Sequence, residues 1–322
     1  MTSREIIWNT LRFKNSERLG HDFPEAYGGT DFAGTGMSPS PDGRPSEGVD
    51  EWGAVWENMG TTQLGEVKKF PLTSWDDWEK LSIPDVTLES RFERLAGARQ
   101  QAGDKFLFGY GVSLYERVHF IRGLENTWMD IYDEPVKLAR LLDILVEMNL
   151  YVIKRYAAEG VDGYIFPDDW GLQNRLMISP AKWRELWKPR YGRVYQAAHK
   201  AGMANFLHSC GHIVDILDDL IEIGLDAIHM DQQENMGLEL LGRRFGGRLT
   251  FFSGVDIQVG LQRSNEEIRQ YCRRMARLLG RPTGGFIPRW YTDPKGAGHR
   301  DDAIATMCEE FQTISREMYG KA

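Results

Sequence analysis

The chain has 322 residues, of which 42% are hydrophobic, and its formal net charge is −8 at pH 7. This size suits one large α/β barrel or two smaller domains. The acidic balance argues against nucleic acid as a partner, and no apolar run approaches the roughly 20 residues that a membrane span needs. Three scattered cysteines are too few for a disulfide framework, and the first residues lack a secretion signal. We therefore expect a cytoplasmic protein.

The first part of the chain differs in composition from the rest. Residues 1–90 are rich in Gly, Pro, Asp and Trp and contain few long periodic segments. Residues 30–48 are mostly small, polar or turn-forming, which predicts a long loop. We interpret residues 1–90 as an N-terminal extension that caps a barrel formed by residues 91–322, within one structural domain.

From about residue 105 onward, short apolar runs alternate with longer helical patterns. Strands are expected at 106–112, 163–166, 203–207, 227–230, 249–252 and 285–287, and helices at 135–159, 180–201, 213–223, 237–245, 265–279 and 301–319. This alternation indicates βαβ units and a parallel sheet. With a contribution from the N-terminal region, it predicts an α/β fold, a (β/α)8 TIM barrel. A doubly wound open sheet is the alternative, but no Gly-x-Gly-x-x-Gly motif follows a strand.

Polar residues follow the last apolar residue of each predicted strand. His208 and Cys210 close one strand, two residues apart, so their side chains point to the same side of an extended backbone. Both are good zinc ligands. The other strands are followed by further polar or aromatic residues: Tyr115, Glu116, Arg117, Asp168, Asp169, Trp170, His229, Asp231, Asp256, Arg289, Trp290 and Tyr291. In a parallel barrel this rim carries the active site.

Each candidate also has a purely structural interpretation. Taken singly, His208 and Cys210 are each best explained as buried packing residues. Only their occurrence as a pair at the end of a strand favours a functional site. Strand alternation makes it improbable that both Asp168 and Asp169 face the mouth. For His229, a role as a metal ligand and a role as a packing residue are equally favoured.

The motifs around these residues resemble the uroporphyrinogen decarboxylase superfamily over nearly the whole length. The matching segments are Asp50-Glu51-Trp52-Gly53, Gly65-Glu66-Val67, Phe70-Pro71-Leu72, Asp168-Asp169-Trp170-Gly171, Ile178-Ser179-Pro180, Trp187-Lys188-Pro189-Arg190-Tyr191, His208-Ser209-Cys210-Gly211, Gly254-Val255-Asp256 and Gly284-Gly285-Phe286-Ile287. The resemblance implies a (β/α)8 barrel with one of two chemistries: cofactor-free decarboxylation of uroporphyrinogen, or zinc-dependent methyl exchange with a corrinoid protein.

The sequence resembles the methyltransferase branch more closely. The Arg-containing N-terminal motif and the Phe-Ser-Asp-Ile motif of the decarboxylases have no counterpart here, whereas His208 and Cys210 match a His-x-Cys zinc pair. That branch has a second zinc-binding Cys near the last strand, and Phe286 occupies its place. The third ligand would then be Asp168, His229 or His299, or the metal is lost or different.

The leading hypothesis is therefore zinc-assisted methyl transfer between a small methylated substrate or thiol and a corrinoid (cobalamin) protein. Its metal ligands would be His208, Cys210 and His229, with Asp168, Asp169 and Tyr115 as catalytic residues. Substrate-binding residues would be Trp170, Arg117, Asp256, Phe286 and Arg289. The alternatives are a uroporphyrinogen-type decarboxylase and a non-catalytic small-molecule-binding barrel. A homodimer is compatible with an acidic barrel of this size.

Overall fold

A curved parallel sheet forms the centre of the molecule. The computed structural model describes residues 1–58, 60, 65–294 and 297–320. Within them the sheet has seven strands in the order β1-β5-β6-β7-β8-β9-β10, every neighbouring pair parallel. The strands are β1 (Phe32–Thr35), β5 (Phe106–Tyr110), β6 (Gly163–Pro167), β7 (Ala204–His208), β8 (Ala227–His229), β9 (Thr250–Ser253) and β10 (Phe286–Pro288).

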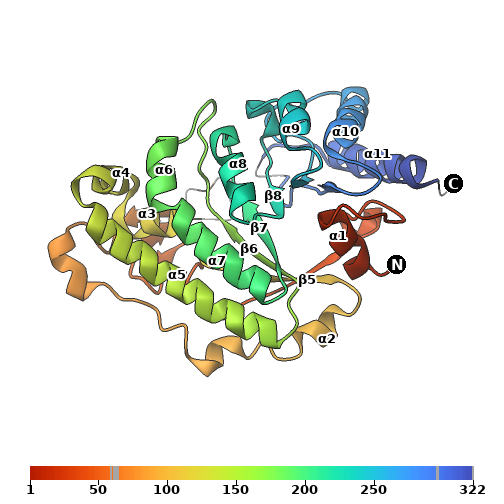
Figure 1. Cartoon of the computed structure of the whole chain (residues 1–322). Helices are drawn as coiled ribbons and strands as arrows, with labels where there is room; N and C mark the ends of the chain where they lie inside the picture. The colour runs from red at the N-terminus through yellow and green to blue at the C-terminus, as the bar shows by residue number, and fades with distance from the viewer. Residues whose placement is uncertain (59, 61–64, 295–296, 321–322) are drawn as a thin grey trace.

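Helices cover the outside of this sheet, as Figure 1 shows for α5, α7 and α8. Their bounds are α1 (Ser3–Leu11), α2 (Ala98–Ala102), α3 (Glu116–Arg122), α4 (Leu124–Asp133), α5 (Pro135–Ala158), α6 (Pro180–Leu186), α7 (Lys188–Lys200), α8 (Val214–Glu222), α9 (Leu238–Phe245), α10 (Asn265–Leu279) and α11 (Asp301–Tyr319). No helix among the described residues is long and apolar enough to cross a membrane.

Aromatic side chains fill the inside of the curved sheet. Phe32, Phe106, Phe108, Phe206 and Phe252 belong to one buried cluster, distinct from the larger core between sheet and helices. Their rings stack or meet edge to face, with Phe32 and Phe108 stacked at 4.9 Å between centroids. Helix α1 adds Ile7 and Leu11 to this cluster and so closes the N-terminal end of the strands. The opposite, C-terminal end is left as the mouth.

The sheet curls like a TIM barrel, but it has seven described strands where eight were predicted. At the gap between β10 and β1, the single residue Asp22 forms a parallel bridge with Arg289 and an antiparallel bridge with Thr30. The backbone N–H of Asp22 donates to the Pro288 carbonyl (3.0 Å), and that of Trp290 donates to the Asp22 carbonyl (3.0 Å). Asp22 therefore stands where an eighth strand would be.

Two sequence expectations for elements are corrected. The segment assigned to a long loop, residues 30–48, contains β1, which pairs with β5 from Phe32↔Phe106 onward. The barrel's first strand and α1 thus lie within the segment assigned to the N-terminal extension. The single helix expected at 180–201 is two helices, α6 and α7, because Pro189 in the first turn of α7 has no N–H to continue the bonding of α6.

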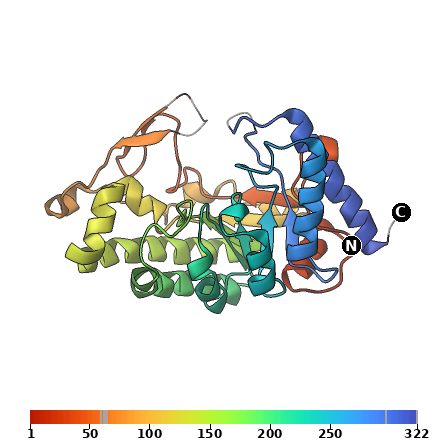
Figure 2. The same ribbon diagram turned by 90° about the horizontal axis from the view of Figure 1, so that it is seen from above.

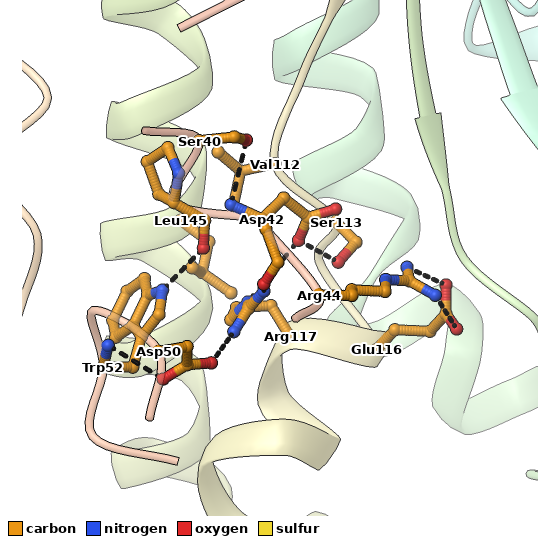
Figure 3. A network of polar contacts seen from close by, with 12 residues as sticks. Ser40, Asp42, Arg44, Asp50, Trp52, Val112, Ser113, Glu116, Arg117 and Leu145 are labelled. Carbon is orange, nitrogen blue, oxygen red and sulfur yellow. Dashed lines mark hydrogen bonds and ion pairs between the residues drawn. The ribbon is translucent and has the colours of Figure 1, made fainter. Parts of the chain in front are cut away.

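A small antiparallel sheet of β2 (Gly48–Val49), β3 (Val55–Glu57) and β4 (Glu66–Lys69) stands apart from the barrel. Figure 2 shows it in orange, projecting beyond the yellow helices α3 and α4. The segment that leads into it is fastened to α3, because Arg117 donates to Asp50 (2.9 Å) and Arg44 donates to both oxygens of Glu116 (3.2 and 2.9 Å; Figure 3). The Trp52 indole N–H also donates to the Pro41 carbonyl (2.8 Å).

Candidate functional site at the barrel mouth

Two loops meet at the mouth, one after β6 and one after β7. Their backbones are in direct contact: the N–H of Gly171 donates to the Cys210 carbonyl (3.2 Å). A side chain at Gly171 would collide with the backbone of Gly211 and His212, and Gly211 itself has φ of +76°. Glycine is therefore required at both positions for the loops to approach this closely.

This contact brings Asp169 beside the His208–Cys210 pair. The Cys210 N–H donates to Asp169 Oδ1 (2.7 Å), and the same oxygen lies 3.6 Å from His208 Nε2. His208 Nε2 lies 3.5 Å from Cys210 Sγ. A tetrahedral zinc ion would hold a nitrogen and a sulfur ligand about 3.6 Å apart, and a nitrogen and an oxygen ligand about 3.4 Å apart. The donor atoms of Asp169, His208 and Cys210 thus already have the spacing of a metal site.

A second chain of contacts lies on the other side of the His208 ring. His208 Nδ1 is 3.0 Å from His229 Nδ1, and His229 Nε2 is 3.6 Å from Asp231 Oδ1. Arg289 donates from Nη1 to the same Asp231 oxygen (2.9 Å). His229 Nε2 is buried and has no hydrogen-bond partner among the described residues. The Nε2 atom of His208 therefore faces Asp169 and Cys210, while its Nδ1 atom contacts His229.

Burial and charge set the protonation of these groups. Burial, together with the positive Arg289 and the adjacent His208, lowers the pKa of His229 to about 3, so this ring is neutral. Burial opposes ionisation of Asp231, but Arg289 and His229 hold its pKa well below the usual range. Burial, followed by the carboxylates of Asp169, Asp231 and Glu116, raises the pKa of the Cys210 thiol. The negative charge around Cys210 is the environment that a bound cation would relieve.

A cavity of about 530 Å³ opens beside His208, His229 and Arg289, whereas Asp169 and Cys210 are not among its lining residues. Its floor is formed by the aromatic rings of the barrel interior, and His208 and His229 lie on one side. The lining consists of Asp22, Thr30, Phe32, Ala33, Gly34, Phe108, Tyr110, Ile165, Phe166, Pro167, His208, His229, Phe252, Arg289 and Thr292. This volume fits a small molecule.

Three predicted site residues lie behind the mouth rather than in the cavity lining. Asp168 is fully buried, and its oxygens accept the N–H groups of Leu114, Tyr115 and Glu116 at 2.8–2.9 Å and the hydroxyl of Tyr191. Burial and the nearby Glu116 raise the pKa of Asp168 to about 8. The Tyr115 ring stacks on Trp170 at 3.7 Å between centroids, and both are buried. These residues hold α3 and the loop after β6 in place.

The remaining candidates are also placed by the structure. Arg117 is buried in the ion pairs with Asp42 and Asp50. Asp256 accepts the N–H groups of Glu234, Gln258 and Val259 and so shapes its own loop. Phe286 packs outside the sheet, against Phe311 of α11 at 5.6 Å between centroids. Of the five residues predicted to bind substrate, only Arg289 lines the cavity.

Asp22 and Tyr110 are among the cavity residues to which the sequence assigned no role. Tyr110 was detectable, because it follows Phe106 and Phe108 at the two-residue spacing that places strand side chains on one face. Asp22 lies in a segment with no periodic pattern and comes to the mouth only through its bridge with Arg289. Asp231 was visible at a strand end, but its link to Arg289 spans 58 positions of sequence. His299, one of the residues considered as a third ligand, donates from Nε2 to the Ile257 carbonyl (2.9 Å) outside the His208 cluster.

The curved parallel sheet and its covering helices define a TIM-barrel-like α/β fold. The family model described as "Uroporphyrinogen decarboxylase (URO-D)" matches residues 58–288, and the chain belongs to this family. It is similar to a uroporphyrinogen decarboxylase of Shewanella piezotolerans, with 24% identity over 77% of this chain and 74% of the relative. Its fold is similar to that of a methyltransferase from Methanosarcina mazei, with a TM-score of 0.73, 14% identity, and coverage of 98% of this chain and 99% of the other.

Proposed function

We propose that this protein is a zinc-assisted methyltransferase that exchanges a methyl group between a small substrate or thiol and a corrinoid carried by a partner protein. The spacing of His208 Nε2, Cys210 Sγ and Asp169 Oδ1 carries the proposal, because all three donor atoms lie within 4.8 Å of one another. Three protein ligands with a fourth position open to substrate is the usual arrangement of a catalytic zinc site.

Asp169 takes the place of the missing second cysteine in this scheme. His229, expected from the sequence to be a ligand, lies on the other side of the His208 ring, where His208, His229 and Asp231 form a second group of donor atoms within 4.8 Å of one another. In this scheme His229 supports His208, and ligation by His229 is the alternative. The carboxylate oxygen is a harder ligand than a thiolate, which leaves the bound zinc a stronger Lewis acid. Bound zinc would lower the pKa of a substrate thiol or polarise a methylated heteroatom. The chain's own residues orient that atom and exclude water through the aromatic floor.

The charge of the cavity lining disfavours the decarboxylase alternative. Uroporphyrinogen carries eight carboxylates, and each such group is best bound by an Arg side chain. Among the described lining residues, Arg289 is the single Lys or Arg, and one guanidinium group cannot bind eight carboxylates. Because the chain belongs to the uroporphyrinogen decarboxylase family, the experiment below also tests this alternative. The decarboxylase alternative predicts turnover of uroporphyrinogen without metal.

The deciding experiment is elemental analysis of the purified protein together with single-turnover methyl transfer to a corrinoid protein. We expect about one zinc per chain in the wild type and its loss in Cys210→Ser and His208→Ala. His199→Ala is the matched control, since its ring pairs with Asp226 on the outside of the barrel and its loss should leave the metal in place.

Zinc-free wild-type protein that turns over uroporphyrinogen would establish the decarboxylase. Binding of small molecules with neither reaction would establish the non-catalytic barrel. Either result would overturn the proposal.

A further inference from the structure

Arg289 has unused bonding capacity inside the cavity. The residue is only 7% exposed, and Nη1 is occupied by Asp231. Nε is buried and has no hydrogen-bond partner, and Nη2 makes no hydrogen bond with any residue in the described part of the chain. Nε and Nη2 lie on the same edge of a guanidinium group, and this edge binds a carboxylate through two parallel bonds. A buried donor left without an acceptor costs about 1–3 kcal/mol, which a ligand carboxylate would recover.

Asp22 presents the opposite charge next to Arg289. The two residues are bridge partners on adjacent backbone segments, and both line the cavity. The Asp22 backbone is used in this pairing. No side-chain hydrogen bond or ion pair joins its carboxylate to another described residue, although its charge is felt by Tyr110 and by Cys308 of α11. The carboxylate lies close enough to Tyr110 that, after burial, it helps to raise the pKa of that phenol. The Asp22 carboxylate is thus a hydrogen-bond acceptor without a partner among the described residues.

The two groups are separated from the metal donors by a short apolar floor. His208 ends β7 and Arg289 follows β10, with β8 and β9 between them in the sheet. Phe252 of β9 lies in this interval, and the Phe108 ring of β5 lies 6.4 Å from it between centroids; both rings line the cavity. A ligand that spans it needs a carboxylate and a donor group at one end, a short apolar linker, and a heteroatom at the other end.

We infer that the small-molecule substrate of this site is an amino acid, with its carboxylate on Arg289, its ammonium group on Asp22, and its sulfur or other heteroatom directed to the His208 end of the cavity, since His208 is the proposed metal donor that lines it. This inference rests on the proposed function for the role of the heteroatom. For a thiol amino acid, the S–C bond forms as the Co–C bond of the partner's methyl-corrinoid breaks. The electron pair of that bond stays on cobalt, and the thiol proton is released to solvent.

Three thiols of similar length test whether the site recognises both the carboxylate and the ammonium group of the ligand, which together form its headgroup. L-Homocysteine carries both charged groups, 4-mercaptobutanoate has only the carboxylate, and 3-mercaptopropylamine has only the ammonium. Binding to the cobalt(II)-substituted protein is followed by the absorption of the thiolate–cobalt bond. We expect L-homocysteine to bind at least tenfold more tightly than either analogue. Equal affinity of the three thiols would overturn the inference while leaving the metal site intact.

A second experiment, on metal-free protein, distinguishes a failure of this inference from a failure of the proposed function. L-Methionine, the methylated form of L-homocysteine, is titrated into metal-free protein by calorimetry, and its binding needs only the headgroup residues. Arg289→Lys keeps a positive charge for Asp231 but loses the two-bond edge, and Asp22→Asn removes the negative charge. Each should weaken methionine at least tenfold, with Asp218→Asn on α8 as the unaffected control. Wild-type protein that binds no methionine, or variants that bind it equally well, would contradict the inference whatever the metal content.

Discussion

At the scale of single residues, the unusual feature is that His208 is shared between two groups of polar side chains. Its Nε2 faces Asp169 and Cys210, whereas its Nδ1 contacts neutral His229, which is backed by Asp231 and Arg289. A ligand histidine held through its second nitrogen keeps one tautomer and one ring orientation. The two neighbours of His208 therefore have different predicted roles: Asp169 as a ligand, His229 as a support.

Substitution of each neighbour distinguishes these roles. Asp169→Ala should abolish stoichiometric zinc, because it removes a donor atom. His229→Leu should leave a zinc site whose affinity is about 10–100-fold lower, since His208 loses only its orientation. Competition with a chromophoric chelator measures both. The opposite ranking, with zinc lost in His229→Leu and kept in Asp169→Ala, would make His229 the third ligand.

At the scale of elements, the three-stranded sheet and the loop before it depend on one buried arginine. Arg117 of α3 is fully buried between Asp42 and Asp50, which are themselves 7% and 6% exposed. Asp50 also accepts the N–H groups of Trp52 and Ala54 and the indole N–H of Trp56. One charge on α3 thus fixes the start of the small sheet.

Loss of that charge should loosen this segment. Arg117→Met leaves two buried carboxylates without their cation, at a cost of about 3–5 kcal/mol. We expect faster amide hydrogen exchange at residues 48–57, measured by mass spectrometry, with α10 unchanged. Arg155→Met is the control, because its partner Glu89 is 78% exposed and water screens such a surface pair. Equal protection of residues 48–57 in Arg117→Met and wild type would show that the sheet is held by packing alone.

Elements with strong local signals were predictable from sequence, and elements fixed by distant contacts were not. Helix α10 has the predicted bounds, because Ser264 and Glu267 form a capping box at its start and Gly280 follows its end. Strand β1 has only four residues, two of them Ala and Gly, and it is stabilised by pairing with β5. The His208–Cys210 pair was visible from its spacing, whereas the position of Asp169 depends on the backbone contact between Gly171 and Gly211.

At the scale of the whole molecule, stability and the candidate site occupy opposite ends of the barrel. Asp162, which precedes β6 at the N-terminal end, is 1% exposed and joins four segments. It accepts from Arg4 Nε (2.7 Å) and Trp8 Nε1 (3.2 Å) of α1, from Arg99 Nη1 of α2 (2.6 Å), and from the Leu107 N–H of β5 (3.0 Å). The carboxylate thereby holds α1 and α2 against the strands whose other ends form the mouth.

Asp162→Ala should therefore lower the free energy of unfolding by about 3 kcal/mol, because it removes several hydrogen bonds to a charged group and leaves buried donors unpaired. Urea denaturation measures this change. Asp218→Ala is the matched control: Asp218 also pairs with two arginines, Arg244 and Arg248, but it is 41% exposed and should contribute less than about 1 kcal/mol. Zinc affinity should be unchanged in folded Asp162→Ala protein, because in TIM barrels the N-terminal face serves stability and the mouth at the C-terminal face carries the chemistry. A loss of zinc affinity at concentrations of urea far below the transition would instead show that the two ends are coupled through the strands.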